Sequence, residues 1–155
     1  MLGDNTYPYQ DDIVSTISPI LHKPFLLLSA PISEIETPST LILTPASALS
    51  TLTAFILHAD PSPVLISSIL TPIVASLYAI NALVDEKKTA DPVLKENVKG
   101  LLVTWGRVTM FEECLSNLWH IVEGEGGQWK LGLGGGISRV EKSVNLHTFQ
   151  LVAEI

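Results

Sequence analysis

Three helix starts share one signature, and they constrain the fold more than any other feature of this chain. A residue with a capping side-chain oxygen stands directly before a proline at Thr44-Pro45, Ser62-Pro63 and Asp91-Pro92. The oxygen accepts a hydrogen bond from a free N–H of the first helical turn, and proline has no N–H to leave unpaired there. The sequence therefore predicts helices that begin at these three prolines.

Each start is followed by a segment of helical length. We predict helices over residues 45–59, 63–87 and 92–108. Pro72 lies inside the second of them and removes a hydrogen bond to the preceding turn. We therefore expect a kink or a break near residues 68–71.

A fourth helix is predicted over residues 110–123. Thr109 and Glu112 have the spacing of a capping box, and Gly124 suits a left-handed C-terminal cap. The third and fourth helices each carry an apolar stripe with a helical period. The stripes are Leu94, Val98, Leu101, Leu102, Trp105 and Val108, and then Phe111, Cys114, Leu115, Leu118, Trp119 and Val122.

Short connections between these amphipathic helices predict antiparallel neighbours. The fold class is thus mainly α, with helical hairpins arranged like an α-solenoid of the HEAT or armadillo kind and a short C-terminal β-hairpin. Two helix pairs are fewer than the three usually needed for independent stability, so we expect a fragment of a longer protein. The predicted segments are residues 1–43, irregular; 44–124, helical repeats; and 125–155, a glycine-rich β-hairpin and tail.

The first 43 residues contain a proline every few positions, which argues against a long helix. Residues 13–21 are compatible with a short helix. Residues 25–29 are compatible with a short strand or an apolar anchor.

The C-terminal part changes character, because seven of the ten glycines lie between Gly124 and Gly136. Residues 128–133 and 137–142 read as two short strands joined by three glycines, which supply the positive φ of tight turns. A third apolar run, residues 146–152, is compatible with a further strand.

The charge of the chain argues against several partners. The formal net charge is −7 and the isoelectric point about 4.9, so neither nucleic acid nor an anionic lipid surface is attracted. Charged residues make up only 16% of the chain, against about 25% in typical domains. Residues 1–84 contain a single basic residue, Lys23, which favours a segment covered by neighbouring protein. Cys114 is the only cysteine, so no internal disulfide is possible.

No motif for catalysis stands out. Residues 132–136 read GLGGG, which lacks both the G-x-G-x-x-G spacing and the lysine of a phosphate-binding loop. We find no histidine paired with another ligand at metal spacing, and Cys114 and His120 lie on different faces of the fourth helix. We therefore predict no catalytic, cofactor-binding, small-molecule or metal-binding residues, and a protein that is not an enzyme. A small enzyme that uses the glycine-rich tail is the weakest alternative.

Three tryptophans and two basic residues are the candidates for contact with a partner. Trp105 and Trp119 lie on apolar stripes, so a core position is the better interpretation of both. Trp129 lies outside any stripe and is a candidate hot spot. Lys99 and Arg107 fall away from the stripe of the third helix and complete the predicted partner-binding set.

A membrane protein is the main alternative. Residues 61–84 contain no charge, and residues 37–59 contain only His58 as an ionisable group. Two such stretches would form a transmembrane hairpin. Several prolines and hydroxyl residues, and the absence of flanking Lys or Arg near Asp60, argue against it.

Several short pieces resemble one known family in their order and spacing. They are Asp60-Pro61-Ser62-Pro63, the run Lys88–Pro92 with Leu94-Lys95-Glu96, the run Gly100–Gly106, and Leu118-Trp119-x-Ile121-Val122-Glu123 with Trp129 after it. In these, residues 60–142 resemble fungal RNA polymerase II nuclear-transport and assembly factors, relatives of the animal transport-and-Golgi-organisation proteins. The resemblance implies a longer HEAT-repeat scaffold that binds polymerase subunits in the cytoplasm and shuttles to the nucleus. It implies no ligand residues.

Overall fold

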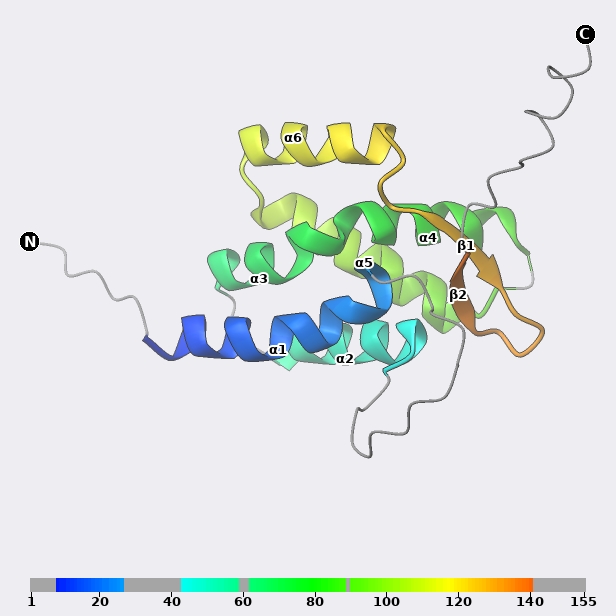
Figure 1. Ribbon diagram of the computed structural model, residues 1–155, viewed down its shortest axis with the longest axis horizontal. Coiled ribbons are helices and arrows are strands. Elements are labelled where there is room, and N and C mark those ends of the chain that lie inside the picture. The colour runs from blue at the N-terminus through cyan, green and yellow to red at the C-terminus, as the bar shows by residue number, and fades with distance from the viewer. Residues whose placement is uncertain (1–7, 27–42, 59–61, 89, 141–155) are drawn as a thin grey trace, which may run out of the picture.

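The computed structural model of the chain describes residues 8–26, 43–58, 62–88 and 90–140 (Figure 1). These residues are mainly helical and end in a two-stranded antiparallel sheet, as predicted. The elements are α1 (Pro8–Leu26), α2 (Pro45–His58), α3 (Pro63–Leu70), the 3-10 turn η1 (Thr71–Ile73), α4 (Val74–Glu86), α5 (Pro92–Val108), α6 (Phe111–Val122), β1 (Gln128–Leu131) and β2 (Ile137–Val140).

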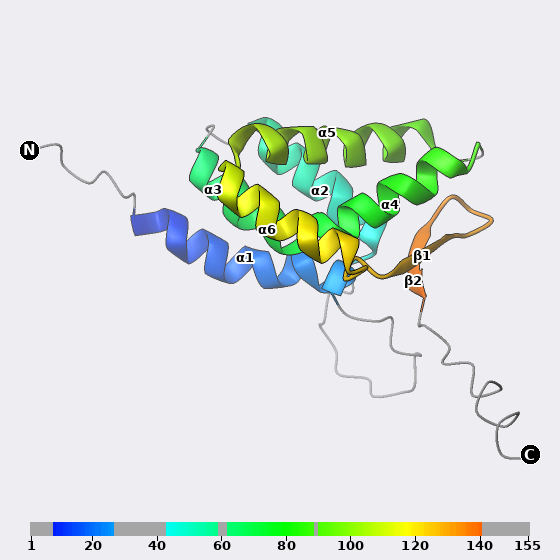
Figure 2. The same ribbon diagram turned by 90° about the horizontal axis from the view of Figure 1, so that it is seen from above.

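The centre of the molecule is the apolar helix that Pro72 divides into α3, η1 and α4. Ser62 caps its start through a hydrogen bond from the backbone N–H of Leu65. Helix α3 ends at Leu70 and α4 begins at Val74, which confirms the predicted break and places it slightly later in the chain. Helices α1 and α5 pack on α3, whereas α5, α6 and β1 pack on α4. Figure 2 shows α1 and α5 on opposite sides of the divided helix.

The hydrophobic core lies between the divided helix and its neighbours. Its fully buried side chains come from α1, α2, the divided helix and α5: Phe25, Leu49, Leu52, Leu70, Ile73, Leu77, Ile80 and Val98 are among them. Helix α5 contacts α2, α3 and α4 at once. The mainly helical class is confirmed, and the regular helix pairs of a solenoid stay a prediction.

The expectation that residues 1–43 hold no long helix is wrong for residues 8–26. Helix α1 is 19 residues long and contains both Pro19 and Pro24. Each proline removes one backbone hydrogen bond, which costs up to about 3 kcal/mol in an isolated helix. Burial of Leu21 and Phe25 in the hydrophobic core, together with the packing of α1 on α2 and α3, offsets that cost. Phe25 is therefore an apolar anchor in a helix, and residues 27–29 lie outside the described residues.

Near the ends of α1 and α3, two backbone carbonyls accept hydrogen bonds from side chains that are distant in the sequence. Carbonyls in the last turn of a helix lack an intrahelical donor. The carbonyl of Ile69, near the end of α3, accepts a hydrogen bond from His22 Nε2 over 2.7 Å. The carbonyl of Phe25, near the end of α1, accepts from Ser76 Oγ and from the Arg139 guanidinium. These bonds tie α1 to the divided helix and to the β-hairpin.

The β-hairpin matches the predicted type, and its first strand ends two residues earlier than expected. Gln128 pairs with Val140 and Leu131 with Ile137, and Gly135 adopts a φ of 79° in the connecting loop. Residues 141–142 and the apolar run 146–152 lie outside the described residues. Glycine is required just before the hairpin, because a side chain at Gly126 would collide with the carbonyl of Ala75 on α4.

One helical stretch among the described residues is long and apolar enough to span a membrane. It is Pro63–Glu86, and half of its apolar window is buried inside the molecule. Helix α2, in the other uncharged run, has only 14 residues, whereas a span needs about 20.

Candidate interaction surface on helix α6

Helix α6 differs from α1 to α5 because none of its residues is buried. It lies on one side of the divided helix, opposite α1 and α2 (Figure 1). Its contact with the rest of the molecule is mainly with α4. The only cysteine, Cys114, is partly buried and packs against the hydrophobic core.

A chain of polar side chains holds the first turn of α6 against the divided helix. Trp105 Nε1 on α5 donates a hydrogen bond to Thr71 Oγ1 over 3.1 Å. The Thr71 hydroxyl donates in turn to Glu113 Oε1 over 3.2 Å, and Ser67 Oγ lies 3.4 Å from the same oxygen. These bonds fix the orientation of α6 without burying its apolar side chains.

Five apolar side chains of α6 point to solvent, and together we call them the α6 face. Phe111 and Val122 are each 76% exposed and Trp119 is 63% exposed, with Leu115 and Leu118 also exposed. The spacing of Phe111, Leu115, Leu118 and Val122 is four, three and four residues. That is the spacing of the seam by which one helix of a coiled coil packs on another.

The start of α6 does not use the predicted capping box. The N-cap position is Met110, which makes no side-chain cap bond. Thr109 is instead the C-cap of α5, and its hydroxyl is buried without a hydrogen-bond partner. The turn between the two helices is so short that Thr109 completes α5, and it stands one residue too early to cap α6.

The end of α6 confirms the predicted left-handed cap. Gly124 has a φ of 78°, and its N–H bonds to the carbonyl of Ile121 over 3.0 Å. The N–H of Glu125 bonds to the carbonyl of His120 over 3.1 Å, which completes a Schellman motif. The motif turns the chain away from α6 toward β1.

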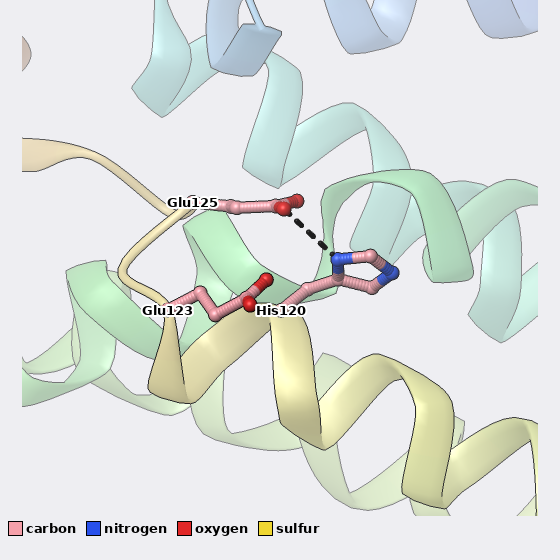
Figure 3. A group of neighbouring side chains, drawn as sticks. All are labelled: His120, Glu123 and Glu125. Atoms are coloured by element: carbon pink, nitrogen blue, oxygen red, sulfur yellow. Dashed lines mark ion pairs between the residues drawn. The ribbon is translucent and has the colours of Figure 1, made fainter.

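This turn brings together three side chains that the sequence did not predict as a group. His120 Nδ1 lies 3.0 Å from Glu125 Oε1, and the ligand atoms of His120, Glu123 and Glu125 all lie within 4.8 Å of one another (Figure 3). The expectation that no histidine has a carboxylate at metal spacing is therefore wrong here. Imidazole and carboxylates are ligands that a divalent cation such as Zn²⁺ accepts. The sequence signal is H-x-x-E-G-E, in which glycine folds the second carboxylate back toward the histidine.

The predicted partner-binding residues end up in different environments. Trp129 is only 8% exposed, its Nε1 donates to the carbonyl of Gly126, and its ring lies 6.2 Å from that of Phe25. It is a core residue and is not available to a partner, which corrects the expectation. Lys99 and Arg107 are exposed on α5.

The other two tryptophans also differ in burial. Trp105 is buried, as expected, whereas the core position predicted for Trp119 is wrong. Trp119 Nε1 donates to Glu123 Oε1 over 2.8 Å at the surface. Its apolar stripe is real, but no element of the described chain covers it.

A groove of about 620 Å³ lies between α1 and the divided helix. His22 lines its floor beside Pro19, Ser68 and Pro72. Burial lowers the pKa of the His22 imidazole below its usual value, because the charged form loses its hydration. Because the carbonyl of Ile69 can only accept, the Nε2 of His22 carries the proton of the neutral ring.

Comparison with known proteins finds no family model, no curated protein and no solved structure that matches this chain. The interpretation of the α6 face rests on its geometry and chemistry.

Proposed function

We propose that this chain is a non-enzymatic protein-interaction scaffold that binds a helix of a partner protein on the α6 face. The observation that carries the proposal is the exposure of all five side chains of that face on a helix that buries none of its residues. Contiguous exposed apolar surface on a folded domain marks an interaction site more often than a chance feature.

The composition of the α6 face suits recognition of a protein. Tryptophan is enriched among the residues that dominate binding energies, and Trp119 lies on the face beside Leu115 and Val122. Burying one exposed leucine or phenylalanine contributes about 1.5–3 kcal/mol. Five such side chains supply enough free energy to offset the cost of ordering a partner helix.

The wider role that we propose follows from the family resemblance. A HEAT-type scaffold uses helices whose side chains dock other proteins along an extended surface. In that role the chain would be a segment of a longer factor that assembles RNA polymerase II in the cytoplasm and accompanies it to the nucleus. The order of the short motifs between residues 60 and 142 supports this, together with the helices that begin at Pro63 and Pro92.

The competing hypothesis is an integral membrane protein with a helical hairpin over residues 37–59 and 61–84. The long apolar stretch Pro63–Glu86 favours it by length and composition. The division of that stretch at η1, the short α2 and the partial burial of the stretch weigh against it.

The test is affinity capture by the tagged chain from a eukaryotic extract without detergent, followed by mass spectrometry. The decisive comparison is between Leu115→Ser on the α6 face and Val103→Ser, an exposed apolar residue of α5, as the matched control. We expect Leu115→Ser to lose the captured proteins and Val103→Ser to keep them. Polymerase II subunits among those proteins would support the assembly role.

Two results would contradict the proposal. One is an identical set of captured proteins for Leu115→Ser and the unmodified chain. The other is recovery of the unmodified chain in the membrane pellet, which would favour the transmembrane hairpin.

A further inference from the structure

We propose that the occupant of the α6 face is an amphipathic partner helix whose apolar side is flanked by lysine or arginine. This inference rests on the proposed function and specifies the chemistry of the partner. It follows from the spacing of the apolar residues on α6 and from the carboxylates that border them.

The spacing favours a helix over an extended peptide or a loop. A seam with four-, three- and four-residue steps presents holes that side chains of a second helix fill. Helix α6 has 12 residues, which corresponds to about 18 Å at 1.5 Å per residue. A partner of about three to four helical turns would cover the full seam from Phe111 to Val122.

The charge beside the seam is negative. Glu112 and Glu123 lie seven residues before and four residues after Trp119, so all three share one side of the helix. Both carboxylates are exposed, and the indole N–H of Trp119 holds that of Glu123 next to the ring. Helix α6 contains no lysine or arginine. Among the described residues, no Lys or Arg nitrogen lies within 4.0 Å of either carboxylate.

The end of the seam adds to this negative potential. The C-terminal end of α6 carries the negative pole of the helix dipole, and Glu125 lies beside it in the Schellman turn. A basic side chain from the partner would meet Glu123 here. An acidic one would be repelled, so the charges select between partners with equal apolar faces.

The group of His120, Glu123 and Glu125 offers a different use of the same carboxylates, as ligands of a divalent cation. All three side chains are exposed, and within residues 8–26, 43–58, 62–88 and 90–140 no further ligand joins their group. The binding experiment is therefore done with and without a metal chelator.

The test uses three fluorescently labelled peptides of 18 residues and the whole chain. The first has leucine at the seam positions of an amphipathic helix and lysine at the flanks. The second has glutamate at the flanks, and the third is a scrambled form of the first. Fluorescence anisotropy gives their affinities, with and without chelator, and a change in tryptophan emission that is lost in Trp119→Phe reports the site of binding.

We expect the lysine peptide to bind about five- to tenfold more tightly than the glutamate peptide at low salt, because exposed ion pairs contribute modestly. The difference should shrink in the double variant Glu112→Gln with Glu123→Gln and at high salt. Glu96→Gln, an exposed carboxylate on α5, is the matched control and should leave it unchanged.

The outcomes separate the two proposals. Equal binding of the lysine and glutamate peptides would overturn the inference about charge while the docking function stands. Binding of neither, with the fold intact by circular dichroism, would overturn both. A lysine-peptide preference that appears only with chelator would assign the carboxylates to a bound cation and would also overturn this inference.

Discussion

Helices α5 and α6 have similar amphipathic sequences, but the apolar side of α5 is buried and that of α6 is exposed. Helix α5 buries Leu94, Val98, Leu101 and Trp105 against three neighbouring helices, whereas α6 buries no residue. Both follow a short connection, and each carries aromatic and aliphatic side chains on one side. An apolar stripe thus specifies that a helix needs a partner surface, and it leaves open whether that surface belongs to the same chain.

The difference also separates two ways of attaching a helix. Apolar burial holds α5, and a buried leucine there contributes to the stability of the whole domain. Helix α6 is positioned by hydrogen bonds from Thr71 and Ser67 to Glu113. This arrangement fixes the direction of α6 and leaves its apolar side free for another molecule.

The strongest way to sharpen the comparison is to shorten one leucine in each helix. Leu101 is 2% exposed, so Leu101→Ala should lower the free energy of unfolding by about 2–5 kcal/mol, through lost burial and a cavity. Chemical denaturation measures this loss. A loss below about 1 kcal/mol would mean that α5 is not the covered helix described here.

The next-largest effect concerns the starts of α5 and α6. Asp91 Oδ1 accepts from the N–H of Val93 over 3.0 Å, so Asp91→Ala should cost about 1 kcal/mol. Thr109→Val should be neutral or slightly stabilising, because the Thr109 hydroxyl is buried and unpaired. Thermal unfolding of both variants checks this. If Thr109→Val lost as much stability as Asp91→Ala, the hydroxyl of Thr109 would be a cap of α6, as the sequence predicted.

A third effect is a dependence of stability on pH, and it comes from the buried histidine of α1. Burial lowers the pKa of His22 in the folded state, so the unfolded chain binds a proton that the folded chain does not. The stabilising contribution is present above the unfolded value of about 6.5 and is lost as the pH falls through and below it. Denaturation between pH 5 and 8 measures the slope.

His22→Gln provides the control for this slope. Glutamine keeps an N–H donor for the carbonyl of Ile69 and does not titrate, so the dependence of stability on pH should flatten. An unchanged slope in this variant would place the responsible group elsewhere.

The smallest expected effect is on α6. Leu115→Ala and Trp119→Ala should each change the free energy of unfolding by about 0.5 kcal/mol or less, because both side chains are largely exposed. The same two variants should weaken partner binding most. A stability loss at Leu115 as large as that at Leu101 would show that α6 is covered in solution, by a second copy or by a part of this chain outside the described residues.

Much of the helical architecture was predictable, because it depends on local chemistry. The start of α5 at Pro92 and its end at Val108 follow from a cap, a proline and a periodic stripe, and the break at Pro72 follows from one missing N–H. The hairpin follows from glycines. All of these signals act within a few residues.

What could not be predicted depends on contacts between distant residues. Helix α1 survives two prolines because its Leu21 and Phe25 belong to a core that elements later in the chain complete. Trp129 is buried because its ring meets Phe25, about a hundred residues away. Trp119 is exposed because no element of the described part of the chain reaches it. The α6 face was visible as a stripe, but its exposure was not.

The carbonyl of Phe25 has a consequence for how the chain folds during synthesis. It accepts from Ser76, 51 residues further along the sequence, and from Arg139, 114 residues further along. At the usual 5–20 residues per second, a ribosome needs about 6–23 s to deliver that arginine after Phe25. For that interval α1 is not yet tied to the hairpin, and the carbonyl has Ser76 as its side-chain donor. The bond between the first helix and the last strand that the structure describes is thus made only after every described helix has been synthesised.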